Sequence, residues 1–301
     1  MIDEVIFTAA RTLVGATHLI ASALAATGPM VVAALRLPGR RPDADTALKR
    51  GLAWSLVAMG VGLATGGLSA WLVSVSPASG YAAAWSRLPG TAVAMLATEW
   101  LITAALYACY WFTWDRWENR RRLHAAVAWF AGTNLLYHFA TMMVVLGAVA
   151  AEPQLASGSP ISRPVFRNLI TQPLALSLAL HYTAYCTLVG GVAIGLALAT
   201  VGAGAKPAAI ALAGLTVSLV TGGAVLVNEP AGVQRAMLGG SLLATMPLLL
   251  SLTLALRLGW LLLAALVADV RGAKPTFREA AWLLFAITLG MVWSGHVVSK
   301  L

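Results

Sequence analysis

The sequence predicts an all-α protein built from about eight transmembrane helices, and three observations predict it. Of the 301 residues, 59% are hydrophobic and only 10% are charged, whereas soluble proteins carry about 25% charged residues. The mean hydropathy is +0.82. The apolar residues form long runs without the alternation that is typical of a membrane β-barrel. These properties exclude a disordered chain, a secreted disulfide scaffold, a nucleic-acid-binding module and an ordinary soluble enzyme.

Eight apolar runs supply the predicted spans, because a bilayer core about 30 Å thick needs about 20 apolar residues per helix. The first run follows Asp3 and Glu4, where a signal peptide would carry lysines, so we expect a retained span. No soluble domain interrupts the runs. We therefore expect residues 1–301 to form one integral-membrane helix bundle, and we find no internal repeat. The runs lie at about 5–35, 52–75, 91–113, 124–150, 173–200, 208–228, 236–268 and 280–298.

The positive charges predict the orientation of the spans. Arg11 and Arg257 lie within or near spans, and the other Lys and Arg residues divide unequally between the two sides. Because Lys and Arg favour the cytoplasmic side, the bias predicts both termini outside, in a bacterial inner membrane. One side holds 13 of these residues, namely Arg36, Arg40, Arg41, Lys49, Arg50, Arg116, Arg120, Arg121, Arg122, Lys206, Arg271, Lys274 and Arg278. The other side holds five, namely Arg87, Arg163, Arg167, Arg235 and Lys300.

Ionisable residues inside spans are costly, and each is therefore a candidate functional residue. Glu99 is the only one of the eleven acids within a span. The fifth histidine, His124, lies beside three arginines, and we expect it to be a solvated interface residue. Nearby, Trp111, Trp114 and Trp117 are expected to anchor the chain at the membrane interface. Four of the five histidines lie on four different spans, in the half of the membrane near the termini: His18, His138, His181 and His296.

Four histidines at similar depth indicate haem b ligation. Neutral imidazole is a common axial ligand of haem iron, methionine is another, and an apolar helix bundle offers the dry cavity that haem needs. Three alternatives stay open. The histidines can be hydrogen-bonded packing residues, or they can hold a non-haem metal, although no span contains His-x-x-x-His or Glu-x-x-His. They can also form a proton or ion pathway with Glu99.

Four short motifs occur in order along most of the chain. They are His18; Glu99-Trp-Leu-Ile-Thr103 leading to Trp114-Asp115-Arg116 and Gly132-Thr133-Asn134; Leu180-His181-Tyr182-Thr183 followed by Gly190-Gly191; and Arg235-Ala236-Met237. Together they resemble subunit I of the cytochrome bd quinol oxidases. The resemblance implies that His181 and Met237 ligate a low-spin haem b, with Met246 as the fallback ligand, and that His18 ligates a second haem.

Further residues are assigned expected roles beside these ligands. His138 and His296 would serve one or two additional haems b, which makes two or three in all. Arg235 would pair with a haem propionate. Glu99 would be a haem neighbour or a proton-handling group, and a purely structural role for it is an equal alternative.

Several departures from that family shape the predicted function. The long quinol-binding loop is replaced by the short connection 228–234, and the family's Gly-Arg-Gln-Pro-Trp tail is absent. Thr288 stands near the position of a glutamate haem ligand, and Thr103 and Met95 stand where the family has two glutamates. A haem with two strong axial ligands has no open position for oxygen, so it passes electrons only.

We therefore predict a haem b electron-transfer subunit of a membrane respiratory complex, which connects the quinone pool to a partner protein. Its predicted partners are other subunits of that complex, quinone or quinol, and membrane lipid. One alternative is a shortened cytochrome bd-type quinol oxidase that still reduces oxygen. Another is a non-redox membrane scaffold or transporter.

Overall fold

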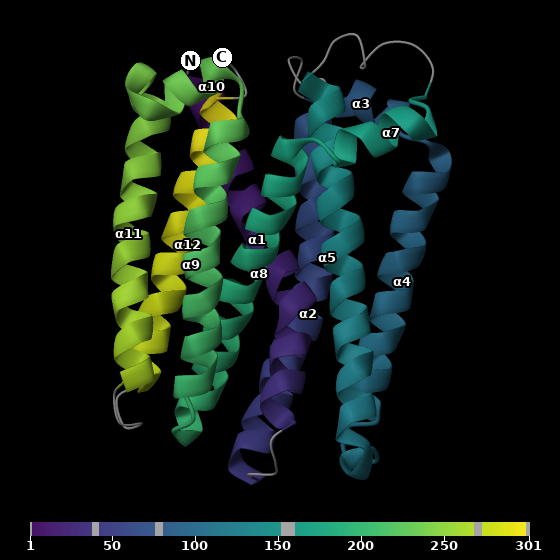
Figure 1. Ribbon diagram of the computed structural model, residues 1–301, viewed down its shortest axis with the longest axis vertical. Coiled ribbons are helices and arrows are strands. Elements are labelled where there is room, and N and C mark those ends of the chain that lie inside the picture. Colours follow the sequence, from purple (N-terminus) through teal and green to yellow (C-terminus); the bar gives the residue numbers. More distant parts are fainter. Residues whose placement is uncertain (1, 38–41, 76–80, 152–159, 268–272, 299–301) are drawn as a thin grey trace.

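The computed structural model describes residues 2–37, 42–75, 81–151, 160–267 and 273–298, and every regular element within these ranges is helical. Eight helices in these ranges are 23 residues or longer (Figure 1). They are α1 (Ile2–Arg36), α2 (Pro42–Ser74), α4 (Gly90–Phe112), α5 (Arg121–Ala151), α8 (Pro173–Leu198), α9 (Ala205–Asn228), α11 (Leu242–Val267) and α12 (Ala273–Val298).

Seven of these helices, all except α5, are long and apolar enough over their described residues to cross a membrane. Their outward faces carry large apolar side chains: Phe112 is 82% exposed, Leu256 72% and Val220 70%. A water-soluble surface rarely exposes apolar area on this scale. The prediction of a multi-pass, all-helical membrane protein is therefore confirmed. α5 is 31 residues long and runs beside the others (Figure 1).

The short helices lie beyond the ends of the long ones. α3 (Tyr81–Arg87), α7 (Arg163–Ile170) and α10 (Ala231–Arg235) lie at the end of the bundle that holds both termini (Figure 1). The single-turn helix η1 (Glu118–Arg120) lies at the opposite end, between α4 and α5. We call this opposite end, where α1, α4, α8 and α11 finish, the basic end, because the described residues Arg36, Lys49, Arg50, Arg116, Arg120, Arg121 and Arg122 lie there.

Two helices begin earlier than hydropathy predicts. α2 begins at Pro42, where the apolar run begins at about 52, and α12 begins at Ala273, where the run begins at about 280. Proline suits the first turn of a helix, and Asp43 and Asp45 in that turn of α2 favour the positive end of the helix dipole. These polar turns extend the helices beyond the apolar core that a hydropathy pattern detects.

The predicted span 236–268 is interrupted near its start. Residues Ala236–Gly240 form a π-helical turn, η3, and α11 begins only at Leu242. Gly239 has φ +123°, a conformation that favours glycine because it has no Cβ atom. The sequence predicts Met237 within a membrane span. In the structure it lies instead in the turn that precedes α11.

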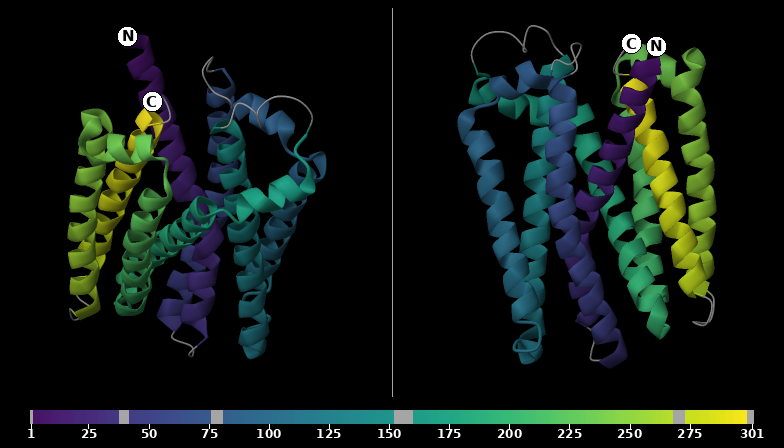
Figure 2. Two further views of the ribbon diagram at one scale, coloured as in Figure 1. Left: turned by 45° about the horizontal axis from the view of Figure 1, so that its top comes forward. Right: turned by 180° about the vertical axis from the view of Figure 1, so that it is seen from behind.

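The bundle divides into two halves, α1–α5 and α8–α12, that each begin with a tightly packed antiparallel hairpin, α1–α2 and α8–α9. α1 and α8 cross near the centre (Figures 1 and 2). At the crossing, the Thr27 hydroxyl donates to the Cys186 carbonyl at 2.5 Å. A Cβ atom on Gly190 would lie 2.7 Å from Thr27 Oγ1, so the close approach requires a residue without one.

The two hairpins repeat a short sequence motif and its contacts, which corrects the expectation of no internal repeat. Residues 61–67 of α2 read Val-Gly-Leu-Ala-Thr-Gly-Gly, and residues 217–223 of α9 read Val-Ser-Leu-Val-Thr-Gly-Gly, identical at five of seven positions. Thr65 Oγ1 donates to the Val61 and Gly62 carbonyls at 2.7 and 3.3 Å. Thr221 Oγ1 repeats this with Val217 and Ser218 at the same two distances.

Contacts between helices repeat as well. Gly28 of α1 approaches Ser55 of α2, and Gly191 of α8 approaches Ala211 of α9 in the same way. An offset of 163 residues relates Gly28 to Gly191, and the same offset relates Thr27 to Gly190. Thr27 and Gly190 contact each other. Equivalent residues meet only at an axis of symmetry, so a pseudo-twofold axis passes through the α1–α8 crossing.

Candidate functional site

His18 lies on α1 with its ring against α2. Its Nδ1 atom is 2.9 Å from the carbonyl oxygen of Gly62. A carbonyl only accepts, so Nδ1 carries the proton and Nε2 of the neutral ring keeps its lone pair. A Cβ atom on Gly66 would lie 2.8 Å from His18 Cε1. The ring therefore occupies space that only a glycine at position 66 leaves open.

His181 lies on α8 and repeats this arrangement with α9. The same offset of 163 residues separates it from His18. Its Nδ1 atom is 2.9 Å from the carbonyl oxygen of Ser218, and a Cβ atom on Gly222 would lie 3.2 Å from His181 Cε1. Ser218 and Gly222 are the repeat equivalents of Gly62 and Gly66. The structure thus places one imidazole of the same tautomer at equivalent positions in both halves.

This geometry suits an axial ligand of haem iron. A metal-ligating histidine usually donates its other ring N–H to a carbonyl or carboxylate, which fixes the ring and leaves the second nitrogen for the metal. Both His18 and His181 are half-buried, and neither Nε2 atom has a hydrogen-bond partner among the described residues. The donor chemistry of the two residues therefore fits the group that the sequence resemblance implies.

The other two predicted histidines lie on the last helix of each half. His296 of α12 is half-buried, and its Nδ1 atom is 3.1 Å from Thr12 Oγ1 of α1. The Thr12 hydroxyl donates to the Thr8 carbonyl, so it accepts from the His296 ring. Thr12 and His18 lie about 9 Å apart along α1. His138 lies on α5, and its side chain is outside the described part of the structure.

The predicted partners of His181 lie near the terminal end of the second half. η3, which carries the half-buried Met237, packs against α10, α11 and α12, whereas α8 packs mainly against α9 and α1. The structure brings Met237 to the same end of the bundle as His181 without direct packing of their helices. Met246, the fallback ligand, is 58% exposed on the outside of α11. Arg235 is exposed at the end of α10.

The short connection between α9 and α10 is closed by its own residues. The Gln234 amide donates to the carbonyls of Val227 and Glu229 at 3.0 and 2.7 Å. Glu229 is half-buried, and burial raises the pKa of its carboxyl group. The connection is therefore short and closed by its own hydrogen bonds.

Glu99, Thr103 and Thr288 lie in hydrogen-bonded surroundings. The half-buried Glu99 accepts a hydrogen bond through its backbone carbonyl from the Asn134 amide at 3.2 Å. That amide also donates to Thr103 Oγ1 at 3.0 Å, and Thr103 is fully buried. Thr288 is 3% exposed, and its hydroxyl lies 3.0 Å from that of Tyr185. Thr103 and Thr288 therefore present hydroxyl groups, which do not ionise in the physiological range.

His124 is a buried structural residue, so the expectation of a solvated interface position is wrong. It is 1% exposed, and its ring stacks on Tyr110 at 4.0 Å. Arg36 Nη1 lies 3.0 Å from His124 Nδ1, and a guanidinium only donates, so this nitrogen accepts. The opposite nitrogen, Nε2, then donates to the Tyr110 carbonyl at 2.9 Å.

Trp114 also belongs to this cluster and is not an interfacial anchor. It is 1% exposed, and the Arg36 guanidinium lies 3.8 Å from its ring centre. Its indole N–H donates to Asp45 at 3.2 Å, and Asp45 in turn pairs with Arg36 at 3.1 Å. We call Arg36, Asp45, Trp114 and His124 the Arg36 cluster. It joins α1 and α2 to the α4–α5 connection at the basic end.

The glycine beside each imidazole yields a first prediction. We expect Gly66→Ala to displace the His18 ring, because the new methyl group would lie inside van der Waals distance of Cε1, and such overpacking costs about 1–3 kcal/mol. Gly67→Ala is the matched control, since nothing lies within 4 Å of a Cβ atom there. Thermal unfolding and nitrogen-15 NMR of labelled histidine would compare the two. Equal spectra for both variants would contradict this placement of the ring.

Among the described residues, no three His, Cys, Asp or Glu side chains gather as a group that could hold a metal ion without a porphyrin. The recurring feature is instead the pair His18 and His181. A scan against protein-family models finds no match to this chain, and a search of the curated proteins finds none either.

Proposed function

We propose that this chain is a haem b-containing integral membrane cytochrome subunit of a respiratory complex. It would transfer electrons between the quinone pool and a partner protein. The observation that carries this proposal is the equivalent placement of His18 and His181, each with its Nδ1 proton committed to a backbone carbonyl. In this proposal all eight long helices, α5 included, cross a bacterial inner membrane, and both termini lie outside.

Each half would hold one haem through its first-helix histidine. Met237 would be the second ligand on the His181 side, and His18, His138 and His296 would serve one or two further haems b. Arg235 would pair with a propionate, and Glu99 would lie in the haem surroundings. When bound, haem b supplies a reversible one-electron couple. The chain orients the imidazoles through the Gly62 and Ser218 carbonyls and keeps their surroundings apolar, and both factors tune the potential.

Electron transfer is favoured over oxygen reduction by the buried threonines. Reduction of oxygen to water consumes protons, which carboxylates commonly relay through a membrane protein. Thr103 and Thr288 stand at the positions where the resembled family has glutamates, and both are buried among neutral hydrogen-bonding groups. Because the 228–234 connection is short and closed on itself, we place quinone binding outside it, elsewhere on the chain or on another subunit.

A reduced-minus-oxidised optical spectrum of the purified protein tests the proposal. We expect the bands of low-spin haem b, unchanged by carbon monoxide, because a haem held by two side-chain ligands would have no open position for it. Bands that shift under carbon monoxide would favour the shortened quinol oxidase instead. A preparation without haem, after expression in a host that supplies it, would refute both and leave a non-redox membrane protein.

A further inference from the structure

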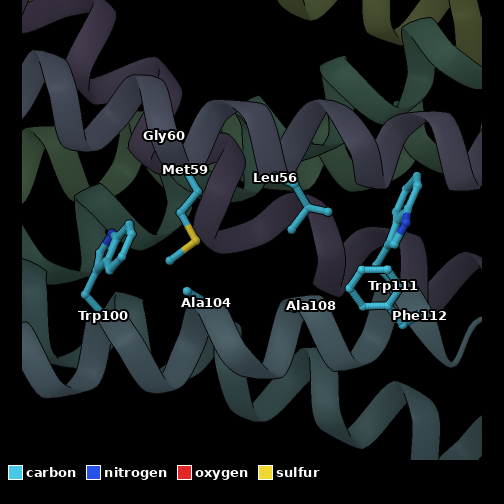
Figure 3. A pocket seen from close by; sticks show the side chains of 8 residues that line it. All are labelled: Leu56, Met59, Gly60, Trp100, Ala104, Ala108, Trp111 and Phe112. Carbon is cyan, nitrogen blue, oxygen red and sulfur yellow. The ribbon is translucent and has the colours of Figure 1, made fainter.

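An apolar groove runs between α2 and α4 toward the basic end of the bundle (Figure 3). Its volume is about 470 Å³, within the range of small-molecule sites. Trp100 lies at one end of the groove, and Trp111 and Phe112 lie at the other (Figure 3). The complete lining is Leu56, Met59, Gly60, Trp100, Ala104, Ala108, Trp111 and Phe112.

The equivalent place in the other half is closed. α9 packs closely against α11, whereas α2 and α4 make few contacts. Leu215, the repeat equivalent of Met59, is buried and lies 3.4 Å from where a Cβ atom on Gly259 of α11 would be. Gly60, in contrast, has nothing within 4 Å of a Cβ position. The groove is therefore specific to the first half and does not follow from the repeated architecture.

Positive charge lies at the end of the groove nearest the basic end. A second hollow of about 420 Å³ shares Trp111 with the groove and is lined by Lys49, Arg50, Asp45 and Asp115. Arg50 is exposed and has no ion-pair partner among the described residues. Lys49 pairs with Asp115 at 3.2 Å, but Asp115 is 82% exposed and free to swing into solvent.

The carboxylates that line the hollow do not neutralise Lys49 and Arg50, so both remain able to bind an anionic ligand. Asp45 is already bound by Arg36 and the Trp114 indole within the Arg36 cluster. The neighbouring turn and the start of α5 add Arg116, Arg120, Arg121 and Arg122 against Glu118. This end of the groove therefore has an excess of positive charge.

We propose that the groove binds one anionic phospholipid from the adjacent leaflet, with an acyl chain between α2 and α4 and its headgroup on Lys49 and Arg50. Basic pockets between transmembrane helices recognise anionic headgroups in this way. The lining offers side-chain hydrogen-bond donors only at Trp100 and Trp111, which suits a hydrocarbon chain better than the two carbonyl oxygens of a quinone ring. The site does not depend on haem, so it stands apart from the proposed function.

Native mass spectrometry of the full chain in detergent, titrated with phosphatidylglycerol or phosphatidylcholine, tests the proposal. We expect one phosphatidylglycerol to be retained per chain, with phosphatidylcholine at least tenfold weaker. The double variant Lys49→Gln, Arg50→Gln should lower the affinity for phosphatidylglycerol by about 30-fold, since each basic residue near the headgroup contributes about 1 kcal/mol and about 1.4 kcal/mol corresponds to tenfold. Lys206→Gln is the matched control, because Lys206 of α9 is the repeat equivalent of Arg50 beside the closed half.

Gly60→Leu provides a second test that leaves both charges intact. Because the new side chain would extend into open space, we expect the fold to persist and the lipid to be excluded. Equal affinity for the two lipids, or unchanged retention in Gly60→Leu, would overturn the proposal. Displacement of the lipid by ubiquinone at equal concentration, or a dimer that hides the groove, would also overturn it by identifying another occupant.

Discussion

Replacing His181 by alanine is expected to remove one haem b per chain, and His18→Ala is expected to remove another. The two imidazoles occupy equivalent places, with the same tautomer and the same kind of carbonyl partner, so we expect losses of equal size. The double variant should lose both haems, because the two residues lie in separate hairpins and act independently. The haem-to-protein ratio, measured as pyridine haemochrome against amino-acid analysis, gives the count.

Imidazole rescue separates ligation from packing in this experiment. In His18→Gly and His181→Gly, added imidazole can enter the space that the ring vacates and restore the low-spin spectrum if the ring nitrogen ligates iron. A purely structural histidine would yield no such spectral recovery. Unchanged haem content in both alanine variants, with the wild type containing haem, would show that the ligands lie elsewhere, for example at His138 and His296.

Arg36→Ala is expected to produce the largest loss of stability at the basic end, about 3 kcal/mol. Arg36 is 5% exposed and bonds Asp45, His124 and the Trp114 carbonyl. Removing it would leave a largely buried carboxylate without its cation and an imidazole nitrogen without its donor, and both groups are costly to bury unpaired. Detergent unfolding followed by tryptophan fluorescence measures this loss of stability.

Asp115→Asn is the control for this stability prediction. It removes an ion pair from the same end of the bundle, but Asp115 is largely solvent-exposed, so the loss should stay below about 1 kcal/mol. A loss of similar size in both variants would mean that the Arg36 cluster contributes no more than a surface ion pair. It would then have no special part in joining α1 and α2 to the α4–α5 connection.

The membrane fold could be predicted from the sequence because hydropathy is a local property. Each apolar run must satisfy its own backbone hydrogen bonds in lipid, so it becomes a helix whatever its neighbours are. The predicted run 173–200 corresponds to α8 and its final turn, and 91–113 corresponds to α4 within one residue at each end. Errors arose where local composition and helix ends disagree, at Pro42 and at the η3 turn near Gly239.

The roles of individual residues required the three-dimensional structure. His124 and Trp114 looked like interface residues because arginines surround them in sequence, but Arg36, 88 residues before His124, buries both in one cluster. The internal repeat is hard to detect in the sequence because its clearest trace, residues 61–67 and 217–223, is a short stretch of small residues in a background of Ala, Leu and Gly.

Composition and hydropathy were enough to establish a helical, multi-pass membrane protein, since each helix forms from its own residues. Only the packed structure related His18 to His181 and separated the open α2–α4 groove from its closed counterpart. The acceptors that orient the imidazoles, the Gly62 and Ser218 carbonyls, are backbone groups that every residue possesses. No side-chain pattern in the sequence predicts which carbonyls will accept these hydrogen bonds, because the carbonyls reach the imidazoles only when two helices pack.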